Sequence, residues 1–172
     1  VVSVSGSSTT ADTIGRVFAV SVEFRPRFEF RNGYRQLRSD TSLPAYFGSH
    51  RSRINLSYTV RGFRFHASVQ DVRVWGTYGQ FSASGSLHVF ESYADADLSR
   101  NMYIRFGRQR VELDNGRLFS AANWNQWSRA HDGMNLIWKN KHASSELMCF
   151  FNQMSERVFE TSYSPTGFSN YK

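Results

Sequence analysis

Arginine is the residue type in this sequence that is best suited to binding chemistry. The chain has 172 residues, and its 21 basic positions comprise 18 Arg and only 3 Lys, which gives a formal net charge of +7. A guanidinium group is always charged and donates paired hydrogen bonds to a carboxylate or a phosphate. The excess of arginine therefore predicts either an anionic ligand or an internal lattice of Arg–carboxylate pairs, and the count alone leaves both open.

Many of these arginines stand at alternate positions of extended segments, most clearly in residues 18–31. One face of this segment is apolar and consists of Phe18, Val20, Val22, Phe24, Pro26, Phe28 and Phe30. The other face is largely charged and consists of Ala19, Ser21, Glu23, Arg25, Arg27, Glu29 and Arg31. Strict alternation over this length predicts a strand of about 45 Å, whereas an ordinary globular strand has about five or six residues.

Six further strands are predicted from weaker alternation, at residues 51–61, 63–75, 86–96, 102–110, 133–139 and 143–152. In the segment 63–75 the apolar and polar positions exchange phase near Gln70 and Asp71. One inserted residue, a β-bulge, would produce this exchange and would place Asp71 and Arg73 on the face of Arg64. The connections between the predicted strands are alternately long and short, as in outer-membrane barrels.

The predicted fold is all-β, a transmembrane antiparallel up-and-down β-barrel of which this chain covers about seven or eight strands. Each arginine facing the middle of a bilayer would cost about 2–4 kcal/mol, so the charged faces require an aqueous lumen and the Phe-rich faces require lipid. Residues 1–15, rich in Ser, Thr and Gly, are expected to form a flexible lead-in. Residues 16–172 are then the N-terminal part of a single barrel domain.

Five short blocks carry a resemblance to a known family: RFEFRNG at 27–33, RSRINL at 51–56, QDVRVWG at 70–76, GRQ at 107–109 and RAHDG at 129–133. Over about residues 24–135 their order and spacing resemble the alginate-export-type porins, particularly those of Bacteroidota-like bacteria. The resemblance implies a monomeric barrel considerably longer than this chain in the outer membrane of Gram-negative bacteria, with an arginine-lined constriction. It does not define the transported solute.

The candidate site is a set of pore-lining, anion-binding arginines with interleaved acidic partners. The basic members are Arg25, Arg27, Arg51, Arg53, Arg64, Arg73 and Arg105 on the strands, and Arg108, Arg117 and Arg129 in or near the long loop. The acidic members are Glu23, Glu29, Asp71 and Asp132. Opposed residues on neighbouring strands lie about 5 Å apart, so each arginine is more simply interpreted as one member of a stiffening ion pair. For the whole set, the basic excess predicts a lumen that attracts anions.

The loop at 111–132 contains Trp124 and Trp127 within a run of amide side chains. These residues could fold inward and narrow the pore, bind a sugar by stacking, or anchor at the membrane interface. Constriction is favoured over sugar binding and weighed equally with the interface role.

Other kinds of site have little support in the sequence. The five histidines have no metal-ligand spacing, no nucleophile lies in a recognisable elbow, and the single cysteine excludes an intramolecular disulfide, so neither an enzyme nor a cofactor is expected. Nucleic acid is not an expected partner, because nucleic-acid platforms place Arg and aromatic residues on one surface, whereas here they lie on opposite faces.

The sequence thus predicts a porin-like channel in contact with outer-membrane lipid, passing small anionic or sugar-acid solutes by passive diffusion or export. The alternative is a structural or accessory barrel with a plugged lumen, held in a larger complex of envelope proteins.

Overall fold

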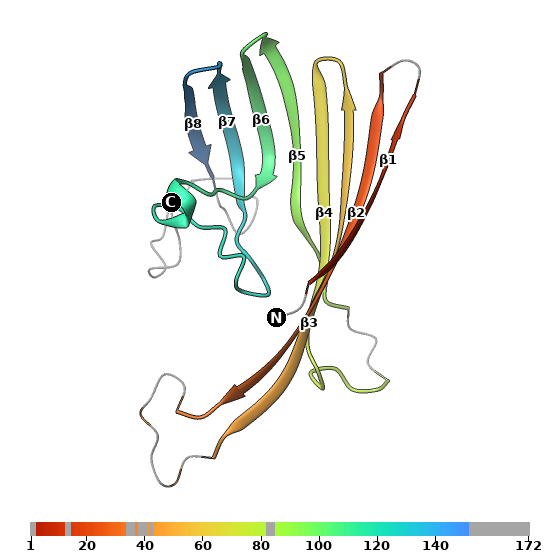
Figure 1. The fold of residues 1–172 in the computed structure, drawn as a ribbon, viewed down its shortest axis with the longest axis vertical. Helices are drawn as coiled ribbons and strands as arrows, with labels where there is room; N and C mark the ends of the chain where they lie inside the picture. The colour runs from red at the N-terminus through yellow and green to blue at the C-terminus, as the bar shows by residue number, and fades with distance from the viewer. Residues whose placement is uncertain are drawn as a thin grey trace, which may run out of the picture.

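A computed structural model describes residues 3–12, 15–33, 37, 41, 43–81 and 85–151. Eight strands form one antiparallel sheet in chain order, with each strand bonded to the next along the sequence. The sheet is not closed, since β1 and β8 are its two edges in the described part of the chain (Figure 1). The strands are β1 (Val4–Ala11), β2 (Val17–Arg31), β3 (Ala45–Val60), β4 (Phe63–Val74), β5 (Leu87–Ser99), β6 (Met102–Gln109), β7 (His131–Lys139) and β8 (Ser144–Phe150).

The all-β, up-and-down architecture predicted from alternation is confirmed, and β2 has nearly the predicted bounds. One strand was not predicted: Val4–Ala11, within the segment expected to be a lead-in, pairs with β2 from Val4↔Phe24 to Ala11↔Val17. Every residue of this edge strand is exposed, so its sequence needs no apolar alternation. Backbone pairing with β2 holds this strand in the sheet. Residue 152 of the last predicted strand lies outside the described residues.

The two faces of the sheet differ sharply in chemistry. We call one the arginine face, which carries Arg25, Arg51, Arg53, Arg64 and Arg105, and the other the aromatic face, which carries Phe18, Phe24, Phe28, Phe65 and Trp138. Among the described residues, twelve buried side chains are polar or charged and only five are hydrophobic. The aromatic face remains open, with Phe28 71% exposed. This is the reverse of a soluble protein, in which apolar side chains form the interior.

The sequence predicts a bulge within the strand 63–75, and this position is wrong. The β3–β4 pairing runs without interruption from Val60↔Phe63 to Ser49↔Val74. The register shift lies in the next pairing, where Ser68↔Glu91 is followed by Val69↔Val89, so that the extra residue is Phe90 of β5. Residues of β4 therefore alternate strictly, and the buried Val72 shares the arginine face with Gln70. On the arginine face of β4 the residue type changes from polar to apolar at Val72. The alternation of side chains between the two faces continues unchanged.

Short and long connections are segregated to opposite ends of the sheet, as predicted (Figure 1). At one end, called the short-turn end, the connections are residues 12–16, 61–62, 100–101 and 140–143. At the other, called the long-loop end, they are residues 32–44, 75–86 and 110–130. A 3-10 turn at Asp114–Gly116 interrupts the last of these. None of the helical segments in the described residues has the length and apolar character needed to cross a membrane.

Candidate functional site

Residues 121–128 of the β6–β7 connection, called the docked loop, lie against the arginine face. The side chain of Arg25 bonds this loop through all three of its guanidinium nitrogens. Nη1 donates to the carbonyl of Asn123 at 2.6 Å and Nη2 to the carbonyl of Asn125 at 2.9 Å. Nε donates to Oε1 of the buried Gln126 at 3.1 Å. Bonds between a charged donor and neutral oxygens are stronger than neutral pairs, so Arg25 holds the loop onto β2.

Arg51 and Arg53 continue this attachment on β3. The side chain of Arg51 is fully buried, donating to Oγ of Ser128 at 2.8 Å and to Oδ1 of Asn123 at 3.0 Å, and it forms an ion pair with Glu23. Arg53 donates to Gln70 on β4 at 3.0 Å, and its guanidinium carbon lies 3.9 Å from the centre of the Phe90 ring. These bonds occupy much of the donor capacity of both guanidinium groups.

The two tryptophans of the loop differ in their packing. The ring of Trp127 stacks on His88 of β5 with ring centroids 5.1 Å apart. The backbone carbonyl of Trp127 accepts a hydrogen bond from the side chain of Gln70 at 2.9 Å. The Trp124 side chain is 75% exposed, while its carbonyl accepts a bond from Arg27 at 3.3 Å. A cavity of about 380 Å³ lies between the docked loop and the arginine face. Both tryptophans, Arg27 and Glu29 are among the residues that line it. The loop thus contacts β2 to β5, the arrangement that the constriction hypothesis requires.

The main acidic partners of Arg64 and Arg105 on the arginine face come from β5 and were not predicted. Arg105 bonds Asp95 with two nitrogens, at 2.7 and 3.0 Å. Arg64 reaches the same carboxylate at 3.3 Å and Asp97 at 2.9 Å. The sequence does contain a signal for this arrangement, since Ala-Asp-Ala-Asp at 94–97 alternates with period two and places both carboxylates on one face.

The bulge in β5 places two consecutive side chains, Phe90 and Glu91, on the arginine face. Both are buried. Phe90 lies under Arg53, and Oε1 of Glu91 accepts a bond from the backbone N–H of Arg110 at 3.1 Å. Because Arg110 is the residue at which the β6–β7 connection begins, Glu91 fixes the departure of this connection from the sheet. The bulge therefore supports both the β6–β7 connection, through Glu91, and Arg53 on the arginine face, through Phe90.

Several predicted site residues do lie on the arginine face. Glu23 pairs with Arg51, and Glu29 pairs with Arg27 at 2.7 Å. Arg27 itself lies beside the docked loop, as noted above. The members found together on this face are Glu23, Arg25, Arg27, Glu29, Arg51, Arg53, Arg64 and Arg105.

Four predicted members of the set lie on the aromatic face. Asp71 and Arg73 pair with each other at 2.7 Å, next to His50, because β4 contains no bulge. Arg108 and Asp132 face each other across the β6–β7 ladder and pair at 2.7 Å. Strict alternation from Arg105 places Arg108 on the opposite face. The prediction of Arg73 and Arg108 as pore-lining residues, with Asp71 and Asp132 among their acidic partners, is therefore corrected, because these four side chains lie on the face opposite Arg64 and Arg105.

The remaining two predicted members belong to the β6–β7 connection. Arg117 is exposed at the end of the 3-10 turn. Arg129 is half-buried, and its backbone N–H donates to the carbonyl of Ala121 at 2.7 Å. Within the described residues, no group of His, Cys, Asp and Glu side chains is arranged to hold a metal ion.

Replacing Asp95 by asparagine should destabilise the protein by about 3 kcal/mol, because the buried carboxylate that pairs with two partly exposed arginines is lost. The matched control is Asp97→Asn. This carboxylate is 37% exposed, and within the described part of the chain its one ion pair is with Arg64, so the expected loss is below about 1 kcal/mol. Denaturant unfolding of the protein in lipid vesicles measures both values. Equal losses for the two variants would contradict the assigned roles.

Comparison with protein families gives one match: a family model described as Alginate export matches residues 18–150. The matched segment begins in β2 and ends at the last residue of β8, so it includes the docked loop and every strand except β1. No curated protein and no solved structure matches the chain.

Proposed function

This chain belongs to the alginate-export family, and on that premise we propose that it forms part of the wall of an outer-membrane channel for anionic solutes. The role of the family is of the outer-membrane export or porin type, and it is not a family of enzymes. The proposal adds the barrel wall spanning the membrane, the preference for anions and the narrowing of the lumen by the docked loop.

The height of the apolar surface supports a membrane-spanning wall. The apolar side chains of β2 run from Phe18 to Phe30 on the aromatic face. At about 3.3 Å per residue and a strand tilt of about 40°, this stretch covers about 30 Å along the membrane normal. Outer-membrane barrels have an apolar band of about 25 Å flanked by aromatic girdles, so the stretch is tall enough to span it. In this orientation the short-turn end faces the periplasm, and other strands pair with β1 and β8 to close the wall.

The observation that carries the preference for anions is the depth of the charged groups on the arginine face. The described strands place eight basic and six acidic residues there, so the net excess is small. Three of the six carboxylates, those of Glu29, Glu91 and Asp95, lie beneath the guanidinium groups with which they pair, whereas Glu23, Asp97 and Glu146 do not. Arg64 is 37% exposed above Asp95 at 5%, and Arg110 is 52% exposed above Glu91 at 4%. At these pairs a solute meets the cationic group before the carboxylate, which raises the local concentration of anions.

Reconstitution of the full-length protein in a planar bilayer tests this function. Under a KCl gradient, the reversal potential should show preference for Cl⁻ over K⁺, with a steady conductance and no energy source. A cation-selective conductance would refute the proposal.

One observation favours the accessory barrel as a second candidate. The docked loop buries Arg51 completely, which is the packing expected of a firm plug. Under this alternative, the protein purified from native membranes would arrive with other envelope proteins in fixed proportion, and the reconstituted protein would not conduct. Conductance by the protein purified alone excludes it.

A further inference from the structure

The side chain of Gln70, fully buried on β4, joins the docked loop to the arginine face. Its amide oxygen accepts hydrogen bonds from Nε and Nη2 of Arg53, at 3.0 and 2.5 Å. Its amide nitrogen lies 2.9 Å from the carbonyl of Trp127 in the loop and 2.7 Å from Nε2 of His88 on β5. We call Arg53, Gln70, His88 and Trp127 the amide bridge. A single amide group therefore connects β3, β5 and the docked loop.

The chemistry of these neighbours determines where each hydrogen of the amide bridge lies. A guanidinium group only donates and a carbonyl only accepts, so the oxygen of Gln70 faces Arg53 and its NH₂ group faces Trp127. The second hydrogen of this NH₂ group points to Nε2 of His88, which must therefore be unprotonated. Nδ1 of His88 lies 3.1 Å from the carbonyl of Ser86 and must carry the ring hydrogen. The arrangement thus requires a neutral His88 with its proton on Nδ1.

A second proton on His88 has no acceptor in this arrangement. The new N–H at Nε2 would face the N–H of Gln70 across 2.7 Å. Rotating the amide by half a turn does not remove the conflict, because its NH₂ group would then face the guanidinium group of Arg53 and its oxygen would face the carbonyl of Trp127. Either orientation opposes like groups next to a buried amide, so protonation removes the hydrogen bond that holds Trp127.

The charged groups around His88 offer the second proton no other partner. The elements packed around this ring contribute Arg53 from β3, Glu91 from β5, and Arg110 and Arg129 from the β6–β7 connection. Residues 75–86, which precede β5, contain no charged residue. Glu91 forms its ion pairs with His66 and Arg110. Within the part of the chain that the structure describes, no carboxylate lies within ion-pair distance of His88.

We propose that Gln70 and His88 position the docked loop and release it when His88 is protonated, so that the lumen is narrow at neutral pH and widens in acid. The docked loop accepts only the neutral ring, so lowering the pH shifts the equilibrium toward the released loop. Histidine side chains change their charge between about pH 5 and 8, and the response is expected in this range. The proposal rests on the narrowing of the lumen by the docked loop, proposed above, and adds its regulation.

Single-channel recording of the full-length protein in a planar bilayer tests this regulation. Between pH 8 and pH 5, the time spent at high conductance divided by the time spent at low conductance should rise by about tenfold, as expected for the loss of one strong hydrogen bond. An unchanged ratio would overturn the proposal. So would a ratio that falls in acid, the result expected if the attraction between a charged imidazole and the indole ring of Trp127 prevails.

Two substitutions of His88 separate its proton from its packing. In His88→Gln, the amide oxygen can replace Nε2 as the acceptor for Gln70 and does not titrate, so the loop should stay docked and the rise in acid should disappear. His88→Phe keeps a ring against Trp127 but offers no acceptor. This variant should show a raised ratio that does not depend on pH. A rise in acid that persists in both variants would overturn the role of His88.

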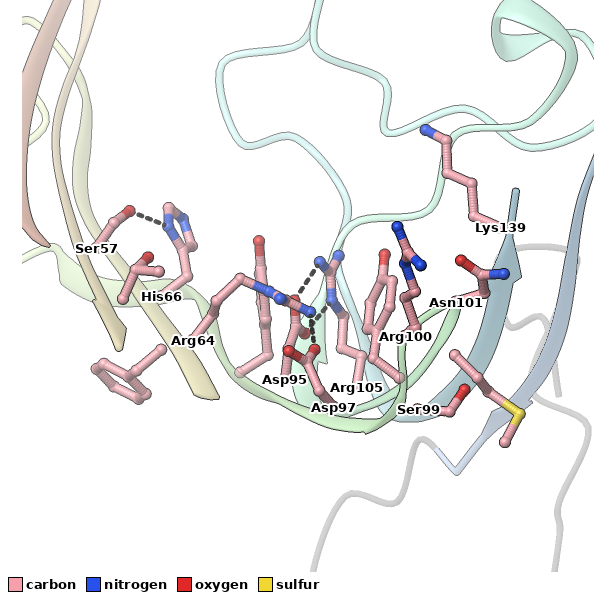
Figure 2. A pocket seen from close by; sticks show the side chains of 15 residues that line it. Ser57, Arg64, His66, Asp95, Asp97, Ser99, Arg100, Asn101, Arg105 and Lys139 are labelled. Atoms are coloured by element: carbon pink, nitrogen blue, oxygen red, sulfur yellow. Dashed lines mark hydrogen bonds and ion pairs between the residues drawn. The ribbon is translucent and has the colours of Figure 1, made fainter. Parts of the chain in front are cut away.

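The matched control is His66→Gln. His66 lies on the same face nearer the short-turn end, where its Nδ1 shares a hydrogen bond of 3.0 Å with Ser57 (Figure 2). A hydroxyl group can donate or accept, and the Glu91 carboxylate lies 3.8 Å from Nε2, so a protonated His66 keeps partners on both sides. This variant should retain the tenfold rise. Loss of the rise in His66→Gln alone would assign the response to His66 and overturn the proposal.

Nitrogen-15 NMR of the histidine-labelled full-length protein in lipid vesicles tests the amide bridge without a current. The signal that His88→Gln removes should be that of a neutral ring protonated on Nδ1 at pH 8 and of a doubly protonated ring at pH 5. Magnetisation transfer between the rings of His88 and Trp127 should be present at pH 8 and lost at pH 5. The other tautomer at pH 8, a ring that stays neutral at pH 5, or a contact that survives protonation would overturn the proposal.

Failure of the regulation and failure of the channel function give different results. An anion-selective current with a ratio that does not respond to pH overturns the regulation alone. A cation-selective current overturns the channel function, and a silent protein supports the plugged barrel. In these two cases the NMR measurement still decides whether protonation of His88 releases the loop.

Discussion

Replacing Arg51 by alanine should release the docked loop and raise the conductance of the full-length channel several-fold. Arg51 is the most deeply buried cation of the wall, and its side chain bonds Ser128 and Asn123 of the loop. The same side chain pairs with Glu23 on β2. Its loss removes the charge to which the loop's oxygens point. Water then enters beneath the loop, and the lumen widens.

The same substitution should lower the free energy of unfolding by about 3–5 kcal/mol, because removing one partner of a buried ion pair leaves the other uncompensated. Of its two ion pairs within the described residues, Glu23 then retains the one with Arg53, at 3.8 Å. Denaturant unfolding in vesicles measures this loss, and the fluorescence of Trp127, which stacks on His88, reports the release of the loop. The matched control is Arg61→Ala in the exposed β3–β4 turn, which should change stability by less than about 0.5 kcal/mol and leave conductance unchanged.

Asn123→Ala provides a milder variant that keeps all charges in place. It removes the amide oxygen that accepts bonds from Arg51 and Ser128. We expect an intermediate rise in conductance with a stability loss of about 1 kcal/mol. Unchanged conductance and unchanged Trp127 fluorescence in both variants would show that the loop does not narrow the lumen.

Replacing Gly107 by alanine should cost roughly 3 kcal/mol or more and can prevent the barrel from folding. Gly107 of β6 has a φ of +125°, a conformation that residues with a side chain rarely adopt. A Cβ atom there would overlap the carbonyl oxygen of Ser92 and lie 2.9 Å from the Cα of Tyr93 on β5. The cost combines overpacking of about 1–3 kcal/mol with backbone strain of similar size.

The neighbouring strand carries the same requirement at its paired position. Gly107 pairs with Gly133 of β7, where a Cβ would overlap the carbonyl oxygen of Cys149. Two glycines facing each other at one level of a sheet are a known means of curving it. The matched control is Gly6→Ala in β1, whose Cβ would meet nothing within 4 Å. Heat-modifiable gel mobility shows whether each variant folds. For the variants that fold, the unfolding midpoint measures the loss of stability. A Gly107→Ala protein as stable as Gly6→Ala would contradict this role.

The bounds of β2 and the content of the two faces were predictable from residues such as Phe24 and Arg25. A side chain in a strand can point only to one face or the other, so alternation over fourteen residues determines which residues share a face. The same reasoning failed for Arg73, because the exchange from polar to apolar at Val72 was interpreted as a change of phase. A buried valine on a polar face and a bulge produce the same pattern in one strand, and only the pairing with β3 distinguishes them.

The sequence by itself determined the all-β class, the long alternating strands, the separation of arginine from aromatic residues and the placing of Arg25, Arg51, Arg53, Arg64 and Arg105 on one face. These follow from local geometry with a period of two residues. Only the tertiary structure decided that Arg25 bonds Asn123 and Gln126, about a hundred positions further along the chain, and that Asp95 is the partner of Arg105. Such contacts depend on strand register and on the path of a loop across four strands, which no periodicity within a single segment encodes.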